Sequence, residues 1–336
     1  NPLKESKSIA AYPNSISVGV LNFIPQLGGY YSGQLDSLKL CLASLGANSE
    51  LPFELLVVDN GSCIEVTEYL TCALRTGRID SLILNRRNLG KMNAQMQLLH
   101  AASGDLVFYS DGDIFYRPGW MEAHLDVLKA FPEAGLVGGI PLHNLADFHT
   151  ARTRAWVDEH QSELVLEKGN LIPENWTRDF FHSIGTKYNE EDWALCQDWR
   201  VVRGECTAFV GASHMQFLTS RKAIDAIPRR RFQFALEPSE TAHLDNCIEE
   251  AGFLRLSVPQ PVVYHIGNAI TEIWLDQEFR RLVQTPLSGK PGDPSTEKTL
   301  PRHWFWGRSK VRQFLRWLSD WAFKTAWEHA RLSPPR

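Results

Sequence analysis

Two aspartates separated by one glycine, Asp111 and Asp113, follow directly on an apolar run that ends at Ser110. Side chains at positions i and i+2 of a strand point to the same face, and Gly112 allows the backbone to turn so that both carboxylates converge. Carboxylate oxygens are the ligands that Mg²⁺ and Mn²⁺ prefer, and Mg²⁺ often completes its shell with substrate phosphates. The motif therefore suggests a metal site for a diphosphate-bearing substrate. An isolated Asp-Gly-Asp is more often a solvated turn, so the residues before and after it must decide.

Polar residues follow three further apolar runs. The first run ends at Asn22, the second continues into Asp59, and the third leads into a basic stretch that contains Arg87 and Lys91. A nucleotide offers a base, a ribose and phosphates, so we expect Asp59 on the base or ribose and Lys91 or Arg87 near the phosphates. The segment from Asp59 to Ser62 alone would also suit a turn and helix cap, but four polar strand ends in succession favour a shared binding site.

The elements that position these residues alternate along the chain. Each apolar, β-branched run indicates a buried strand, and the segments between the runs carry apolar residues at helical spacing. This alternation predicts a parallel sheet with right-handed crossovers, in which ligands bind beyond the carboxyl ends of the strands. The sequence contains no GxGxxG or GxxxxGK[ST] motif, which argues against a dinucleotide fold and a P-loop. The predicted strands are Ile16 to Phe23, Phe53 to Asp59, Ile79 to Asn85 and Asp105 to Ser110.

The composition is that of an ordinary globular protein, with 336 residues, 43% hydrophobic and 22% charged. A formal net charge of -4 provides no basic field, so we expect no nucleic-acid partner. The cysteines form no CxxC pair, which argues against a zinc site or a disulfide framework. Residues 1–15 are polar, and no apolar run reaches the roughly 18 residues that a membrane span needs, so we expect a cytoplasmic protein.

The segment from Pro301 to Arg336 is basic and rich in tryptophan, with eight Lys or Arg residues against two acids. Its apolar residues follow helical spacing, which predicts a C-terminal amphipathic helical tail. Such a helix can lie in an anionic membrane interface, where tryptophan anchors and basic side chains add affinity. We therefore expect this tail to contact the inner face of a membrane peripherally, a second subunit, or the chain's own folded domain.

Further motifs surround the polar strand ends. They are Ile16-Ser17-Val18-Gly19-Val20, Val57-Val58-Asp59-Asn60-Gly61-Ser62, Asn88-Leu89-Gly90 followed by Asn93, Ala101-Ala102-Ser103-Gly104-Asp105, Ser110-Asp111-Gly112-Asp113 and Pro118-Gly119-Trp120. In this order and spacing the chain resembles the family 2 glycosyltransferases of GT-A fold, over roughly residues 16–268. The resemblance implies an α/β fold with a mostly parallel, Rossmann-like sheet flanked by helices and an acceptor-side insertion.

The resemblance also implies the chemistry. It predicts a metal-dependent, inverting transfer of a sugar from a nucleotide-diphospho sugar, UDP- or GDP-linked, to a hydroxyl acceptor on a glycan, a lipid-linked molecule or a protein. The implied cofactor is Mn²⁺ or Mg²⁺. The metal would be held by Asp111, Asp113 and His265, with Asp113 the more direct ligand. The residues expected to bind the nucleotide sugar are Asn22, Asp59, Asn88, Gly90, Lys91 and Asp111.

The catalytic base is where the chain departs from the family. Many relatives carry Glu-Asp at the start of an acidic helix, whereas this chain has Glu240 followed by Thr241 at that place. We expect Glu240 to be the base and Asp245, one turn further along, to be the second candidate. His243 is a further candidate, and the acidic pair Glu191-Asp192 is a weaker rival.

The resemblance divides the chain into segments. Residues 16–141 would form the nucleotide-sugar-binding half and residues 142–270 the acceptor-binding half. The insertion 142–206 is rich in aromatic residues, which could stack on sugar faces or form a small core of their own. A polar extension 1–15, a linker 271–300 and the tail 301–336 complete this division.

Two other functions remain open. A catalytically silent sugar-nucleotide-binding or membrane-scaffold protein could keep Asp111 and Asp113 and lack the base, and Thr241 gives this alternative weight. A sugar-phosphate nucleotidyltransferase is disfavoured, because the glycine- and arginine-rich loop that it needs after the first strand is absent.

Overall fold

The computed structural model of the chain describes residues 16–284, except for 144, 196 and 229–237. Residues 192, 193 and 238–242 lie in helices, and for them the structure describes the backbone but not the side chains. The described residues belong to one folded unit that ends at Thr285. The polar extension 1–15 and the tail 301–336 lie outside the described residues, so the membrane or subunit contact of the tail stays a prediction.

The first half of the chain alternates strands and helices, as its sequence predicts. Strand β1 is buried at every position, which explains why its sequence is almost continuously apolar. Gly19 in this strand leaves room for helix α3, because a Cβ atom there would overlap the side chain of Leu98. The elements are β1 (Ile16–Asn22), α1 (Gln34–Ala47), β2 (Glu54–Asp59), α2 (Ile64–Arg75), β3 (Ser81–Leu84), α3 (Lys91–Ala101) and β4 (Leu106–Asp111).

These strands belong to a mixed sheet with the order β3-β2-β1-β4-β10-β6-β11-β9-β8-β7. The pairings of β1 with β2 and β4, and of β2 with β3, are parallel, as predicted. Strand β10 pairs antiparallel with β4 and β6, and β7, β8 and β9 pair antiparallel in succession. The predicted α/β class with a Rossmann-like sheet is confirmed. The later strands are β6 (Ala134–Gly138), β7 (Val165–Gly169), β8 (Asp198–Arg203), β9 (Cys206–Val210), β10 (Gln216–Ser220) and β11 (Leu254–Ser257).

A separate two-stranded ribbon joins the two halves of the chain. Strand β5 (Ile114–Tyr116) begins directly after the aspartate motif and pairs antiparallel with β12 (Val263–His265). The register places His265 opposite Ile114, the residue that follows Asp113. The ribbon therefore carries a histidine from the end of the sequence to the carboxyl end of β4.

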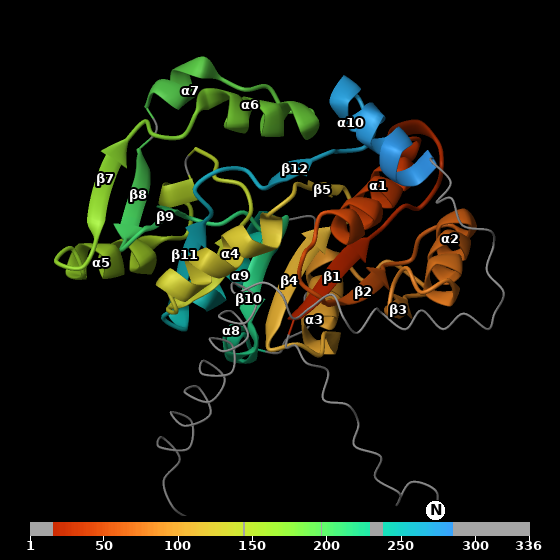
Figure 1. Ribbon diagram of the computed structural model, residues 1–336, viewed down its shortest axis with the longest axis horizontal. Helices are drawn as coiled ribbons and strands as arrows, with labels where there is room; N and C mark the ends of the chain where they lie inside the picture. Colours follow the sequence, from red (N-terminus) through yellow and green to blue (C-terminus); the bar gives the residue numbers. More distant parts are fainter. Residues whose placement is uncertain (1–15, 144, 196, 229–237, 285–336) are drawn as a thin grey trace, which may run out of the picture. The chain divides into compact units, whose positions relative to one another are not determined.

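Helices cover both faces of the main sheet (Figure 1). Side chains of α3, α8 (Arg221–Ala226) and α9 (Pro238–Glu250) share one buried cluster with Val107 and Tyr109 of β4. Helix α4 (Trp120–Ala130) covers the opposite face, where the ring of Trp120 lies 4.8 Å from that of Phe108. The alternation of side chains along β4 thus supplies two apolar layers.

The predicted insertion, residues 142–206, adds helices and two strands of the main sheet. Its helices are α5 (Ala151–Glu159), α6 (Glu174–Ser183) and α7 (Glu190–Ala194). Asp198 joins three parts of the insertion through hydrogen bonds. Its buried carboxylate accepts from His143 Nδ1 at 2.9 Å. The same carboxylate accepts from the backbone N–H groups of Leu171 and Ile172. Helix α6 lies next to strand β12 (Figure 1). The insertion thus reaches the ribbon that carries His265.

The residues after β12 fold back on the first half. Helix α10 (Ile273–Phe279) contacts α1 and continues into a π-helix, η4 (Arg280–Gln284). Leu275 and Phe279 are buried in a cluster with Phe115. The range 271–300, which we expect to be a linker, therefore begins with a packed helix. Of the helices in the described part of the chain, none is both long and apolar enough to cross a membrane.

Candidate active site

The parallel register brings three of the predicted site residues to one edge of the sheet. Asn22 lies beside Asp59 in the pairing of β1 with β2, and Leu21 lies beside Asp111 in the pairing of β1 with β4. All three strands end there, so their last side chains meet at the place where ligands bind in such sheets.

The carboxylate of Asp59 is fully buried and held by three donors. Asn22 Nδ2 donates to Oδ1 at 2.8 Å, the backbone N–H of Ser62 donates to Oδ2 at 2.9 Å, and the Ser62 hydroxyl also donates to Oδ1. These contacts fix the carboxylate in one orientation. Oδ1 already accepts two hydrogen bonds, whereas Oδ2 accepts one and keeps acceptor capacity for a ligand.

Asn88 and Gly90 shape the loop that precedes α3. The side chain of Asn60 donates to Asn88 Oδ1 at 3.0 Å and accepts from the backbone N–H of Leu89 at 3.0 Å. Asn88 Oδ1 also accepts from the N–H of Gly90 at 2.8 Å. Gly61 makes this contact between loops possible, since a Cβ atom there would lie 2.6 Å from the backbone of residue 87. The two loops therefore form one rigid wall of the site.

Lys91 and Tyr109 orient Asp111. Lys91 is the first residue of α3, and its Nζ lies 2.6 Å from Asp111 Oδ2. The Tyr109 hydroxyl donates to Oδ1 at 2.6 Å. Burial and the negative charge of Asp111 raise the pKa of Tyr109 well above its usual value, so this hydroxyl remains a donor. The side chain of Lys91 is 43% exposed, which leaves the ammonium within reach of a bound anion.

Asp113 faces His265 across the ribbon, with 3.4 Å between Oδ2 and Nε2. Burial would raise the pKa of Asp113, but the hydrogen bond and charge of His265 outweigh it, and the pKa lies below its usual value. Burial lowers the pKa of His265, but the hydrogen bond and charge of Asp113 outweigh this effect and raise it. The pair is therefore stabilised in its ionised form.

His265 is positioned by the end of helix α6. Its Nδ1 lies 2.8 Å from the hydroxyl oxygen of Ser183, which itself donates to the carbonyl of Phe180 at 2.6 Å. Since the Ser183 proton is used on that carbonyl, the proton between Ser183 and His265 belongs to Nδ1, and Nε2 is directed at Asp113. Gly267 permits this approach, because a Cβ atom there would overlap the backbone of Ser183.

The residues at this edge fit a hard divalent cation. Within the described residues, no group of three or more His, Cys, Asp or Glu side chains already has the arrangement of a metal site. Asp113 Oδ1 is nevertheless buried and has no hydrogen-bond partner in the described structure, so its lone pairs are available to an ion. Two carboxylates suit Mn²⁺ or Mg²⁺, and Nε2 of His265 can add an imidazole ligand when the ion displaces its proton. Asp111, Asp113 and His265 are the residues that would hold it.

The candidate bases lie on and near helix α9. Glu240 is in the first turn of this helix, and its side chain is outside the description. Asp245 is buried, and its Oδ2 lies 2.9 Å from a guanidinium nitrogen of Arg255, with both side chains 1% exposed. His243 is half-buried near Cys247, and Glu191 is exposed on α7. Asp245 Oδ2 also lies 3.9 Å from Nδ1 of His214, the residue before Met215, whose carbonyl accepts a hydrogen bond from the backbone N–H of Asp111.

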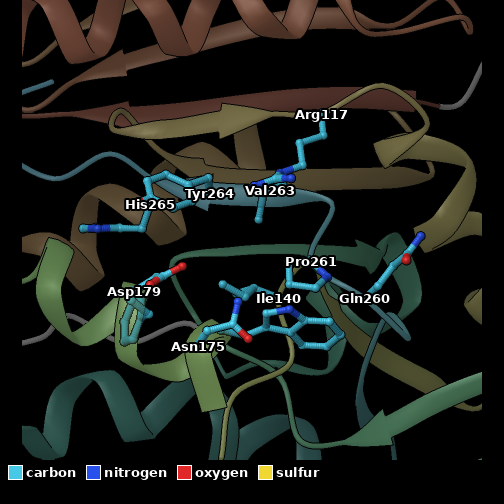
Figure 2. Close-up of a pocket in the computed structure, with 11 residues that line it drawn as sticks. Arg117, Ile140, Asn175, Asp179, Gln260, Pro261, Val263, Tyr264 and His265 are labelled. Atoms are coloured by element: carbon cyan, nitrogen blue, oxygen red, sulfur yellow. The ribbon is translucent and has the colours of Figure 1, made fainter. Parts of the chain in front are cut away.

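A cavity of about 280 Å³ lies beside His265, between helix α6 and strand β12 (Figure 2). Figure 2 shows Asn175 and Asp179 of α6 on one side of it and Tyr264 and His265 of β12 on the other. Trp176, Phe180 and Gln260 also line it. Sequence reasoning singled out the aromatic residues of this insertion but not Asn175, Asp179 or Gln260.

Ser183 and Tyr109 are further contributors that sequence reasoning missed. Tyr109 could have been found, because it stands two residues before Asp111 on a strand and so shares its face. Ser183 is 82 residues from His265, and no local pattern connects them.

Residues 31–192 match the model of the family described as Glycosyl transferase family 2. No curated protein matches the chain. A mannosyltransferase, PcManGT from Pyrobaculum calidifontis, solved with GDP-Man and Mn²⁺, is 14% identical with a TM-score of 0.44 over 75% of this chain and 56% of its own. S. aureus TarS 1-349, solved with UDP-GlcNAc, is 17% identical with a TM-score of 0.30 over 38% of this chain and 35% of its own. The chain therefore spans little more than half of the first of these proteins and about a third of the second.

The matched segment contains all but the first of the motifs that carry the resemblance, since residues 16–20 precede it. Asp59, the loop at Asn88, and both aspartates of the Asp111 to Asp113 motif lie inside it. The resemblance to the family 2 glycosyltransferases is therefore confirmed over residues 31–192, which match the model of that family.

Proposed function

We propose that the chain catalyses a metal-dependent, inverting transfer of a sugar from a nucleotide-diphospho sugar to a hydroxyl acceptor. The observation that carries this proposal is the set of Asp111, Asp113 and His265 at one strand edge, with the buried Oδ1 of Asp113 lacking a partner among the described residues. A hard cation held there would lie next to the basic side chain of Lys91, as a diphosphate requires. UDP- and GDP-sugars are the proposed donors.

Each residue of the site has a proposed role in binding the donor. Asp59, held by Asn22 and Ser62, accepts a hydrogen bond from the nucleotide base. Asp111 contacts the ribose and the metal, and Lys91 contacts the phosphates. Asn88 and Gly90 shape the loop before α3, which lies next to the proposed donor site.

The transfer itself needs a leaving group and a base. A bound Mn²⁺ or Mg²⁺ would offset the negative charge on the departing diphosphate. Lys91 adds a second positive charge at the same place, because its ammonium is within reach of a bound anion. A base must lie within hydrogen-bond reach of the acceptor hydroxyl, and we place Glu240 first in this role and Asp245 second.

Substitution of Asp113 by asparagine tests this function. Asp113→Asn keeps the size of the side chain but removes the charge that binds the ion. We expect it to lower sugar transfer by at least about a hundredfold and to weaken Mn²⁺ binding measured by electron paramagnetic resonance. The assay uses a panel of UDP-, GDP- and dTDP-sugars, and the configuration of the product, read by NMR, tests inversion.

Asp36→Asn is the matched control, since Asp36 is an exposed acid on α1 that pairs with Lys39. Full activity of Asp113→Asn would overturn the metal proposal. Donor binding by the wild-type protein without turnover of any donor would instead favour the catalytically silent alternative.

A further inference from the structure

One face of helix α6 combines aromatic and polar side chains along the cavity. Asn175 and Asp179 are four residues apart, as are Trp176 and Phe180, so all four side chains lie on one side of the helix. Aromatic faces that stack on C–H groups, next to amides and carboxylates that bind hydroxyls, are the groups that a sugar ring requires.

The polar groups of the cavity are available to a ligand. Within the part of the chain that the structure describes, the side chains of Asn175, Asp179 and Gln260 make no hydrogen bond or ion pair. Together they offer donors as well as acceptors, which matches the two-way hydrogen bonding of a hydroxyl group.

The acid in the lining of the cavity disfavours a negatively charged ligand. Asp179 has no ion pair among the described residues, whereas His265 is paired with Asp113 and the guanidinium of Arg117 lies 5.4 Å from the ring of Trp274. Burial and the nearby acids Glu272 and Asp179 raise the pKa of Tyr264 to about 12, so its hydroxyl is neutral. A carboxylate or phosphate in the cavity would meet Asp179 with like charge.

The position of the cavity connects it to the proposed transfer. The ring of His265 lines the cavity, and Nε2 of the same ring faces Asp113 at 3.4 Å. A ligand in the cavity therefore lies one side chain away from the place proposed for the donor diphosphate. The volume, about 280 Å³, falls just below the range of about 300–1,000 Å³ for drug-sized ligands, which suits a single sugar ring.

We propose that this cavity binds the terminal sugar of the acceptor, and that this sugar is neutral. Trp176 and Phe180 supply the apolar surface, and Asn175, Asp179 and Gln260 bind the hydroxyls. The assignment as an acceptor site rests on the proposed glycosyltransferase function, whereas the binding of a neutral sugar rests on the cavity alone.

Saturation-transfer NMR of the full chain tests the proposal without requiring turnover. The probes are the methyl glycosides of glucose, galactose, mannose, N-acetylglucosamine and glucuronic acid, each with UDP or GDP and Mn²⁺ present. We expect at least one neutral glycoside to bind and the glucuronide to bind at least about tenfold more weakly.

Two variants and two controls locate the binding. Trp176→Ala and Asp179→Asn should each lower the affinity for the neutral glycoside about tenfold. Asp179→Asn should also reduce the difference in affinity between the neutral glycoside and the glucuronide. The affinity for UDP or GDP should stay within about twofold, because neither residue is in the donor site. Trp156→Ala and Asp158→Asn, on α5 outside the cavity, are the matched controls.

The outcomes separate this inference from the proposed function. Glycoside binding that neither variant changes, or a glucuronide that binds as tightly as the neutral sugars, overturns the inference. If glycosides bind as expected but no donor binds or turns over, the cavity is a sugar site and the proposed function fails. If donor sugars turn over but no glycoside binds, the function stands and the inference fails. Asp179 is exposed, so Asp179→Asn remains informative even if Trp176→Ala does not fold.

Discussion

At the scale of single residues, the donor side of the site consists of acids whose orientation is set by neighbouring donors. Asp59 is held by Asn22 and Ser62, and Asp111 is held by Lys91 and Tyr109. Such contacts lower the cost of ordering the side chains when a ligand binds, because the carboxylates are already in place. Asp113 differs, since one of its oxygens has no partner within the described residues.

Lys91→Met tests the role of the lysine. The change keeps a long side chain but removes the charge that lies 2.6 Å from Asp111 and near the proposed diphosphate. A charge-assisted hydrogen bond contributes about 1.5–3 kcal/mol, so we expect the affinity for UDP or GDP, measured by calorimetry, to fall at least about tenfold.

Lys39→Met is the control for this experiment. Lys39 forms a similar ion pair with Asp36, at 2.8 Å, on the surface of α1. If Lys91→Met binds the nucleotide as tightly as the control does, Lys91 serves only to hold Asp111.

At the scale of elements, the sequence predicts the strands and helices whose formation depends on residues close together in the chain. The four strands of the first half carry continuous apolar runs, and the helices between them carry helical periodicity, so both were predictable. Strands β5 and β12 have only three residues each, and their pairing depends on contacts across the fold. For the same reason the contact of α6 with His265 could not be predicted, although the histidine itself could.

Helix α4 contains a buried histidine that makes the stability depend on pH. His124 is fully buried between Trp120, Phe108 and Gln216, and its Nδ1 lies 2.7 Å from the carbonyl of Trp120. Burial lowers the pKa of His124 from 6.5 to about 4. Between these values the unfolded chain binds a proton that the folded protein does not, so stability falls as the pH falls.

The expected contribution of His124 is about 3 kcal/mol, fully present above pH 6.5 and lost progressively as the pH approaches 4. Urea unfolding at pH 7.5 and 4.5 measures it. His124→Gln cannot be protonated, so its stability should decrease less over this interval than that of the wild-type protein. Equal decreases in the two proteins would show that His124 is not the group responsible.

At the scale of the whole described unit, one buried arginine joins elements that are distant in the sequence. Arg255 on β11 pairs with Asp245 on α9 and donates to the backbone carbonyls of Phe148, His149 and Ala212. It thereby links the insertion, the loop after β9 and the acidic helix. An acid engaged in such a pair is poorly placed to accept a proton from an acceptor, which is a further reason to propose Glu240 before Asp245.

Stability and activity measurements on the same variants distinguish a structural role of Asp245 from a role as the catalytic base. Breaking a buried ion pair leaves one charge without a partner and costs about 3–5 kcal/mol, so Arg255→Met should lower the melting temperature markedly. The double variant Arg255→Met with Asp245→Leu should recover much of the loss, because no uncompensated charge remains. Asp245→Asn should also lower the melting temperature, and its transfer activity should fall only with the folded fraction.

Glu240→Gln should give the opposite result. A base contributes about 10²–10⁴-fold to the rate, so transfer should fall by at least a factor of about 100 while the melting temperature and the affinity for UDP or GDP stay unchanged. An Asp245→Asn protein that melts like the wild type and yet loses transfer would reverse the order of the two candidates. The acid would then be available to the acceptor in spite of Arg255, and α9 would have to present Asp245 rather than Glu240 to the site.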